Sequence, residues 1–290
     1  MPRLPLLCLL GALAACNGAD ADASPERPAL PPGMLPGSQL TNADAPPPSV
    51  PFESATPRYG LKVLRRHPHD TDAYTQGLVL MGNRLLESVG RYGQSDVREV
   101  TIANGGIARR TRMDDAYFGE GLAAVGNRLY QLTWRAEKGF VYDGKTLAVV
   151  DSFAYRGEGW GLASDGQSLF ISDGSPEIRV LSLPGYAVTR TIRVTEGSTP
   201  VPALNELEFV DGELWANVYQ TRWIARIDPA SGAVKGWIDT DGILTAAEAQ
   251  TVNAAGGVPN GIAYDAASKK LYVTGKLWPV LAQVEVTARR

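Results

Sequence analysis

The sequence predicts an all-β fold, a five-bladed β-propeller, and three observations support this prediction. Five segments of the chain align as copies of one unit. Each copy has alternating β-branched or aromatic residues on both sides of a Gly, Asn or Asp turn, which is typical of a β-hairpin. The copies recur at intervals near the roughly 40 to 45 residues that one four-stranded propeller blade requires.

The five copies share a marker position near the start of the first strand. They read TQGLVLMGNRLLESVG, GEGLAAVGNRLYQLTW, GWGLASDGQSLFISDG, LNELEFVDGELWANVY and PNGIAYDAASKKLYVTGK, and their markers are Gly77, Gly121, Gly161, Glu206 and Gly261. These markers are 44, 40, 45 and 55 residues apart. The segments after the hairpins, such as GFVYDGKTLAVVDSFAY, fit two further outer strands.

Two segments lie outside the repeats. The long last interval contains ILTAAEAQTVN, where Thr245 and Glu248 have the spacing of a capping box, so we expect a short helix inserted before the last blade. The segment YGLKVLRRHPH, from Tyr59, reads as a lone strand that would complete the last blade and close the ring.

Residues 1–15 read as an export signal. One Arg precedes an apolar run from Leu4 to Ala15 that is too short to span a bilayer comfortably. The sequence LAAC, ending at Cys16, resembles the bacterial lipobox, in which the cysteine is acylated; an ordinary secretory signal with an incidental cysteine is the alternative. Asn17 stands where an inner-membrane retention signal usually has Asp. We therefore expect an exported, periplasmic protein anchored to the outer membrane by a lipid.

Residues 16–57 are predicted to be a disordered tether after the lipidated cysteine. Residues 17–57 hold ten of the twenty prolines and few large apolar residues, so they cannot bury enough surface to offset the entropy of ordering. Residues 58–290 are long enough for one sizeable domain, which contains no cysteine and therefore no disulfide. A net charge of −3 without a basic cluster argues against nucleic acid as a partner.

Two positions in each copy are predicted to converge at one mouth of the central channel. The first, just before the innermost strand, is occupied by Gln76, Glu120, Trp160, Asn205 and Asn260. The second lies fourteen residues later, or sixteen in the last copy, and is occupied by Gly90, Trp134, Gly174, Tyr219 and Lys276. Because equivalent positions of the blades ring the channel, we expect these side chains to face one another.

Most of these residues also have a plain structural interpretation. Amides such as Gln76 and Asn260 often satisfy loop backbone groups, and their residue type alone favours that role. Trp134 and Trp160 could be core aromatics, but beside a carboxylate, a lysine and an asparagine they also fit the walls of a small pocket. Lys276 could be an ordinary solvated lysine, or a charge partner and oxyanion stabiliser.

Glu120 is the sharpest candidate for chemistry. A surface carboxylate is the ordinary alternative, but a Gly-Glu-Gly loop beside Phe118 and Trp134 would partly desolvate the carboxylate and raise its pKa toward neutrality. A group with such a pKa can both take and return a proton near pH 7.

Metal and nucleophile chemistry find little support. His67 and His69 are the only histidines, whereas a catalytic zinc needs three protein ligands. The predicted domain has no cysteine nucleophile, and no nucleophile-elbow sequence accompanies a serine. We expect no catalytic metal and no cofactor.

Nine motifs, in order along nearly the whole chain after the tether, carry a resemblance to a known family. They are YTQGL, ESVGRYGQSDVR, YFGEGL, QLTW, GWGLASDG, LNELE, WANVYQT, NGIAYD and TGKLWP. Any one of them is weak, but nine in order are specific. Together they resemble the plant-type, or papaya-type, glutaminyl-peptide cyclotransferases, a family with bacterial members.

The resemblance implies a five-bladed propeller enzyme that converts the N-terminal glutamine of a peptide to pyroglutamate and releases ammonia. It implies that Glu120 transfers protons and that Asn205 and Lys276 hold and polarise the substrate. The implied substrate-binding residues are Gln76, Phe118, Trp134, Trp160, Tyr219 and Asn260. Tyr219 departs from the tryptophan more usual in the family, which alters the expected shape of one pocket wall. Some relatives hold a calcium ion in the channel, but no dedicated calcium loop is recognisable here.

Several alternatives stay open. Lys276 as the base, with Glu120 as an orienting group, requires a strongly depressed lysine pKa. A non-catalytic propeller lipoprotein that scaffolds envelope proteins would show an apolar patch and release no ammonia. A propeller lactonase would need carboxylates and amides around a metal, whereas the five first positions hold one carboxylate. We expect a monomer whose partners are peptides or proteins that begin with glutamine.

Overall fold

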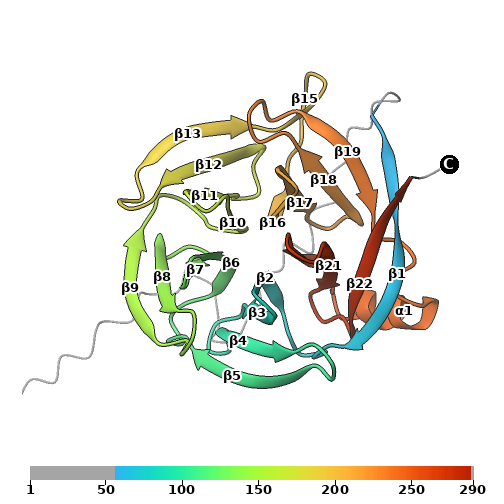
Figure 1. The fold of residues 1–290 in the computed structure, drawn as a ribbon, viewed down its shortest axis with the longest axis horizontal. Coiled ribbons are helices and arrows are strands. Elements are labelled where there is room, and N and C mark those ends of the chain that lie inside the picture. Colours follow the sequence, from blue (N-terminus) through green and yellow to red (C-terminus); the bar gives the residue numbers. More distant parts are fainter. Residues whose placement is uncertain (1–55, 289–290) are drawn as a thin grey trace, which may run out of the picture.

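The computed structural model describes residues 56–288, whose regular structure is almost entirely β-strand. Figure 1 shows the sheets arranged in a ring around a centre, with the later strands of each four-stranded sheet lying progressively farther out. The predicted all-β propeller architecture is therefore confirmed. The predicted signal peptide, Cys16 and all but the last two residues of the predicted tether lie outside the described residues.

Three of the sheets are separate four-stranded antiparallel sheets in which neighbours in sequence pair in space. The first contains β2 (Thr75–Met81), β3 (Arg84–Val89), β4 (Asp96–Thr101) and β5 (Gly106–Arg112). The second contains β6 (Gly119–Val125), β7 (Arg128–Thr133), β8 (Lys138–Asp143) and β9 (Val149–Ala154). The third contains β10 (Leu162–Ser164), β11 (Ser168–Ile171), β12 (Glu177–Ser182) and β13 (Val188–Arg193).

The fourth and fifth predicted units share one eight-stranded sheet. Its spatial order is β16 (Leu204–Val210), β17 (Glu213–Val218), β18 (Trp223–Ile227), β19 (Val234–Asp239), β1 (Arg58–Pro68), β22 (Val280–Ala288), β21 (Lys270–Gly275) and β20 (Pro259–Asp265). β1 pairs antiparallel with β22 through nine residue pairs and parallel with β19 through three. The segment predicted to be a lone closing strand thus completes the last group of strands.

The predicted helix is present as α1 (Ala246–Ala254), between β19 and β20. Its capping box is complete, because Thr245 Oγ1 accepts from the Glu248 backbone N–H and the Glu248 carboxylate accepts from the Thr245 N–H. Arg66 of β1 pairs with Glu248 at 2.7 Å. A hairpin of two very short strands, β14 (Thr195–Glu196) and β15 (Thr199–Pro200), was not predicted. No helix in residues 56–288 has the length and hydrophobicity needed to cross a membrane.

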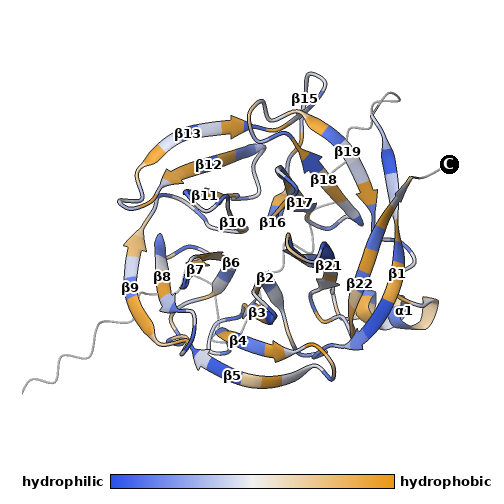
Figure 2. Ribbon diagram, viewed as in Figure 1, coloured by the Kyte–Doolittle hydropathy of each residue, from blue (hydrophilic) through white to orange (hydrophobic). Residues whose placement is uncertain are grey.

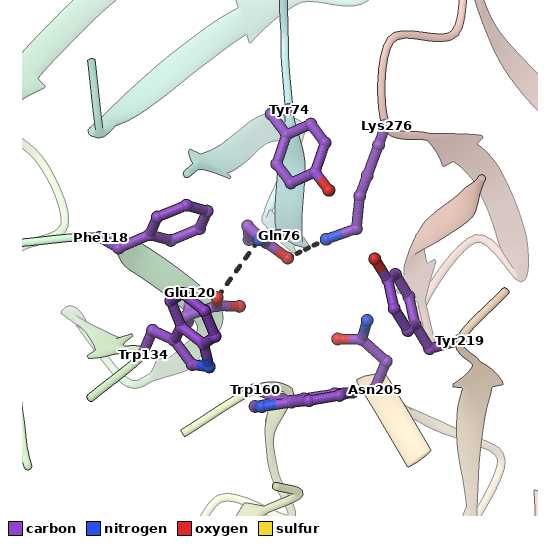
Figure 3. Close-up of a pocket in the computed structure, with 9 residues that line it drawn as sticks. All are labelled: Tyr74, Gln76, Phe118, Glu120, Trp134, Trp160, Asn205, Tyr219 and Lys276. Atoms are coloured by element: carbon purple, nitrogen blue, oxygen red, sulfur yellow. Dashed lines mark hydrogen bonds between the residues drawn. The ribbon is translucent and has the colours of Figure 1, made fainter. Parts of the chain in front are cut away.

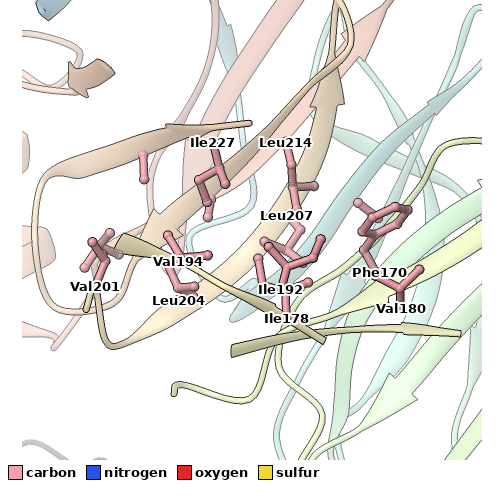
Figure 4. Packing of buried hydrophobic residues seen from close by; sticks show 14 of the residues in the cluster. Phe170, Ile178, Val180, Ile192, Val194, Val201, Leu204, Leu207, Leu214 and Ile227 are labelled. Atoms are coloured by element: carbon pink, nitrogen blue, oxygen red, sulfur yellow. The ribbon is translucent and has the colours of Figure 1, made fainter. Parts of the chain in front are cut away.

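The hydrophobic core lies between neighbouring sheets. In the region that Figure 4 shows, Phe170 and Val180 of the third sheet pack in one cluster with Leu207 and Leu214 of β16 and β17. Burying one such side chain contributes roughly 1.5–3 kcal/mol. The outermost strands β5, β9 and β13 are mostly exposed, and Figure 2 shows polar and apolar residues mixed along them.

The glycine markers allow the inner strands of adjacent sheets to approach closely. A Cβ on Gly161 would lie 1.9 Å from the backbone oxygen of Asn205. In the fourth unit Glu206 replaces the glycine, and its carboxylate accepts from the backbone N–H groups of Leu78 and Ile262 at 3.3 and 3.0 Å. The starts of the inner strands are therefore packed tightly against one another, which makes them a rigid base for a site.

Candidate active site

One pocket forms where the inner strands begin. The pocket encloses about 430 Å³ of free space, including its open mouth. Figure 3 shows the residues that line it, which are Tyr74, Gln76, Phe118, Glu120, Trp134, Trp160, Asn205, Tyr219 and Lys276. In an antiparallel hairpin the start of the first strand and the end of the second lie at the same edge. The two predicted positions of each repeat therefore meet there.

Three polar residues of the pocket lie at irregularities in the strand pairing. The register of β2 with β3 shifts between Thr75 and Gly77, around Gln76. Corresponding shifts occur in the hairpin of β6 and β7 around Glu120 and in that of β16 and β17 around Asn205. A β-bulge bends the strand and redirects a side chain, and bulges are frequent next to active sites. The repeat therefore provides, at each inner hairpin with such a shift, a side chain turned out of the regular pleat.

Eight of the nine residues predicted to contact substrate line this pocket, and Asn260 does not. Asn260 is fully buried, and its Nδ2 donates to the backbone oxygen of Thr75 at 2.9 Å. Its geometry corresponds to the backbone-satisfying role that its residue type favours. Asn260 therefore does not line the pocket, and its predicted contact with substrate stays a prediction.

Gln76 connects the acid and the lysine. Lys276 Nζ donates to Gln76 Oε1, and Gln76 Nε2 donates to Glu120 Oε1 at 3.3 Å. Figure 3 shows the three side chains in one line across the pocket. Only 5% of Glu120, 3% of Gln76 and 2% of Lys276 is exposed, so the line lies in a largely dehydrated environment. Gln76 therefore bonds to two side chains and not to a loop backbone.

Burial drives both charged groups of this line toward their neutral forms. It raises the pKa of Glu120 well above the ordinary value of a glutamate, against the attraction of Lys276 and with help from the carboxylate of Glu158. It also lowers the pKa of Lys276 to about 8, although Glu120 and Glu206 oppose the change. Groups that titrate closer to neutrality can exchange protons with a substrate efficiently. The lowered lysine pKa has the direction that the alternative with Lys276 as base requires.

Aromatic rings form the walls of the pocket. Phe118 and Trp134 pack edge to face with ring centroids 5.6 Å apart, and Trp160 and Tyr219 do the same at 5.6 Å. Such pairs contribute about 0.5–1.5 kcal/mol beyond their buried area. The ammonium of Lys276 lies 4.6 Å from the centroid of the Tyr74 ring. The walls thus enclose the polar line and leave room for a short side chain.

Asn205 offers the pocket an unused hydrogen-bonding atom. The residue is 3% exposed, and its Oδ1 has no hydrogen-bond partner among the described residues. A buried amide oxygen is normally paired. An amide in this position can hydrogen-bond to a bound substrate.

Two residues of the site were missed by sequence reasoning. Tyr74 lines the pocket two residues before Gln76 but precedes β2 and lies outside the two aligned positions of the repeat; its place in the motif YTQGL was the available signal. Glu158 lies behind the wall and accepts hydrogen bonds from the indoles of Trp134 and Trp160. A carboxylate two residues before a pocket tryptophan was the available signal, because a buried indole N–H needs an acceptor.

The donor set of the site does not resemble a metal centre. No group of three or more His, Cys, Asp or Glu residues within residues 56–288 is placed to hold an ion. The channel carboxylate Glu206 uses both of its oxygens to accept backbone N–H groups. Both ring nitrogens of His69 are already hydrogen-bonded, to the Trp278 backbone oxygen and to Glu87, so neither is free to bind an ion.

The fold and the site together define a class of protein: a β-propeller with a small aromatic pocket that holds a buried carboxylate and a buried lysine. The model of the glutamine cyclotransferase family matches residues 37–286. The chain is 42% identical over 228 residues to the glutaminyl-peptide cyclotransferase of Arabidopsis thaliana. The aligned residues cover 78% of this chain and 71% of the relative. The protein belongs to the glutamine cyclotransferase family.

A solved structure agrees with this assignment. The crystal structure of the glutaminyl cyclase of Myxococcus xanthus matches with a TM-score of 0.74 and 33% sequence identity. The match covers 81% of this chain and 100% of the other. The likeness in sequence and in fold therefore extends over most of the described residues.

Proposed function

We propose that the pocket binds the N-terminal glutamine of a peptide or protein and converts it to pyroglutamate, with release of ammonia. The observation that carries this proposal is the line of Lys276, Gln76 and Glu120 inside an aromatic pocket. Membership of the glutamine cyclotransferase family supports the choice of substrate and reaction.

The reaction is an intramolecular transfer of an acyl group. The α-amino nitrogen of the substrate attacks the carbon of its own side-chain amide, and a new C–N bond closes the lactam ring. The bond to the amide nitrogen breaks. The amine loses one proton and the departing nitrogen gains one, so ammonia leaves and no other reactant is consumed. A pocket that folds the side chain back on the amine supplies much of the required proximity.

Glu120 is assigned the proton transfer. An α-amine has a pKa of about 7.7–8, so a substantial fraction is in its neutral, nucleophilic form near that pH. Glu120 accepts the proton that the nitrogen of the neutral amine loses as the new bond forms, and returns it to the departing nitrogen. Its burial suits both steps, because a raised carboxyl pKa makes it a stronger base when ionised while leaving it able to donate.

Lys276 and Asn205 are assigned the stabilisation of the oxygen that becomes negative during the attack. Donors that are already in place and shielded from water stabilise such charge strongly. In the free protein Gln76 presents its carbonyl to Lys276 and its NH₂ group to Glu120. The substrate amide needs the same neighbours, a cation at its carbonyl and the Glu120 carboxyl group at its nitrogen, although in the reaction the proton moves from Glu120 to that nitrogen. The pocket therefore already places one amide, its own, between these two groups.

The test is an assay of the purified protein on a peptide that begins with glutamine, following ammonia release and the mass of the product. The same peptide with an acetylated α-amine is the matched control, since it lacks the nucleophile. We expect ammonia from the free peptide alone. A purified, folded protein that releases none from any glutamine-initiated peptide would favour the scaffold alternative.

We propose further that the reaction needs no metal and that the protein acts as a monomer at the outer membrane. The donor set of residues 56–288 supports the first point, and the sequence of residues 1–16 supports the membrane anchor. Activity that survives exhaustive treatment with a chelator would agree with the first, and activity restored only by added metal would contradict it. A mature protein from cells whose mass lacks an acylated Cys16 would contradict the anchor.

A further inference from the structure

One carboxylate outside the pocket lining bonds to both of its tryptophans. Trp134 Nε1 and Trp160 Nε1 donate to the same atom, Glu158 Oε2, at 2.7 and 2.9 Å. The other carboxylate oxygen accepts from Arg135 Nε at 2.9 Å. Trp134 follows β7 of the second sheet and Trp160 precedes β10 of the third. Glu158 therefore ties together walls contributed by two different sheets.

This arrangement fixes the orientation of both indoles. Figure 3 shows the nitrogen edges of the two indoles close to each other. The Arg135 guanidinium also lies over the Trp134 ring, with its carbon 3.8 Å from the centroid. An indole N–H in a pocket wall requires an acceptor, and without one the hydrogen bond that stabilises the rotamer of the ring is lost. With 36% of its side chain exposed, Glu158 keeps its charge partly solvated, so its burial costs little.

Few other charges or ionisable groups act on the two carboxylates. Those that interact electrostatically with Glu120 are Lys276, Glu158, Tyr74, Tyr92, Tyr155 and Tyr219. Those that contact or interact with Glu158 are Arg135, Tyr92 and Arg179, which donates to its backbone oxygen. Among these, Glu158 is the acidic side chain that acts on Glu120.

We propose that Glu158 is a positioning residue, which holds Trp134 and Trp160 as one rigid wall of the substrate pocket and places a negative charge near Glu120. This inference rests on the proposed function, because the wall and the charge matter for a substrate only if the cyclisation occurs in this pocket.

The two roles have separable consequences. The hydrogen bonds from the indoles to Glu158 set the width of the pocket. Loss of these bonds should weaken binding of the substrate side chain and raise KM more than it lowers kcat. The charge of Glu158 makes ionisation of Glu120 harder and thereby raises the Glu120 pKa. Because Glu120 must be ionised to accept a proton, its pKa sets the acidic limb of the pH profile of kcat/KM. Removal of the Glu158 charge should move that limb to lower pH.

Three variants separate these roles. Glu158→Ala removes both the hydrogen-bond acceptor and the charge, whereas Glu158→Gln keeps a carbonyl oxygen that the indoles can use and removes only the charge. Glu177→Gln is the matched control, because Glu177 is a half-exposed carboxylate on β12 that pairs with Arg193. It removes the same charge from the protein outside the pocket.

The expected results differ among the variants. Glu158→Ala should lower kcat/KM about tenfold or more, mainly through KM, since a hydrogen bond to a charged group contributes at least that factor. Glu158→Gln should recover most of this loss. Both should show the acidic limb at lower pH than the wild type and the control. The indole N–H resonances of Trp134 and Trp160 in ¹⁵N-labelled protein should shift in Glu158→Ala and not in Glu177→Gln.

The outcomes distinguish this inference from the proposed function. If the wild type releases ammonia but both Glu158 variants match the control in KM and in pH profile, the positioning role is wrong. If the wild type releases none, the proposed function is wrong and the inference about catalysis falls with it. The indole resonances then still report whether Glu158 holds the two rings.

Discussion

Two buried carboxylates, Glu87 and Glu120, lie close to the same inner strands and yet behave in opposite ways. Glu87 is fully buried on β3 and accepts from Thr75 Oγ1 at 2.7 Å and from His69 Nε2 at 3.1 Å. Burial alone would raise its pKa, but His69, the nearby Arg98 and the Thr75 hydroxyl lower the pKa below the ordinary value. Glu120 accepts one hydrogen bond from the amide of Gln76, and its pKa is raised.

The difference lies in how completely each charge is compensated. Glu87 has a cationic partner in direct contact, so its ionised form is the stable one. Glu120 meets Lys276 only through Gln76, and the attraction does not offset the loss of water. A buried carboxylate in direct contact with a cation stays ionised and acts as a structural element, whereas one without such contact retains the ability to gain and lose a proton. Two glutamates thus have different roles: Glu87 stabilises the fold, and Glu120 is suited to proton transfer.

The largest effect is expected from Glu120→Gln. It should lower kcat about 10²- to 10⁴-fold, because proton transfer by a positioned group is worth that much. Steady-state ammonia release from a glutamine-initiated peptide is the measurement, with thermal unfolding as the control for folding. Near wild-type activity in a folded Glu120→Gln variant would mean that another group transfers the proton, and Lys276 would then be the first candidate.

Glu87→Gln should act on stability instead. Removing one partner of a buried ion pair leaves the other charge uncompensated, which costs about 3–5 kcal/mol. Glu120→Gln should be neutral or stabilising at neutral pH, since it removes a poorly compensated charge. Chemical denaturation of both variants at one pH measures the contrast. Equal loss of stability in the two would remove the distinction between a structural and a functional carboxylate.

Lys276→Met tests the other end of the polar line. Loss of one donor to a developing oxyanion should lower kcat about 10²- to 10³-fold. Lys276 lowers the pKa of Glu120, so its removal should also move the acidic limb of the pH profile to higher pH. This direction is opposite to that expected for the Glu158 variants. An acidic limb that does not move would mean that Lys276 and Glu120 are not coupled.

The smallest expected effects are changes in folding stability with pH. The folded state raises the pKa of His69, because Glu87 outweighs the effect of burial, so its contribution to stability is complete below the unfolded pKa and is lost as pH rises through the folded value. Glu87 contributes above its unfolded pKa and loses this contribution as pH falls through its lowered folded value. The His69–Glu87 pair therefore stabilises the fold most at pH values above the unfolded pKa of Glu87 and below the unfolded pKa of His69.

Glu120 affects the pH dependence of stability in the direction opposite to Glu87. Its folded pKa is raised, so the folded state holds the proton more tightly and loses stability as pH rises above the unfolded pKa. Unfolding free energies measured from acid to neutral pH for the wild type and Glu120→Gln should diverge in that direction. Parallel curves would contradict the raised pKa.

Much of the fold follows from local sequence. The Gly, Asn and Asp turns between alternating segments predict the inner hairpins, and the spacing of Thr245 and Glu248 predicts the helix cap. These features depend on residues that are neighbours along the chain. The merging of two units into an eight-stranded sheet was not predicted, because it depends on contact of β1 with β19, which are far apart in sequence.

The site was predicted less completely than the fold. Repeat alignment identified seven of the pocket residues, and the family resemblance added Phe118. The alignment also included Asn260, because it reports an equivalent position and not the direction of a side chain. Glu158 lies outside the aligned positions and acts through two indoles, so its role depends on packing between sheets. The contact of Gln76 with both Lys276 and Glu120 likewise joins residues that are distant in sequence.

The pairing of β1 with β22 determines when the active site comes into existence. Gln76 follows β1 closely along the chain, and Lys276 shortly precedes β22. The contact between them is therefore made only when the two ends of the ring meet. The polar line of the pocket thus depends on closure of the ring and not on any one sheet alone.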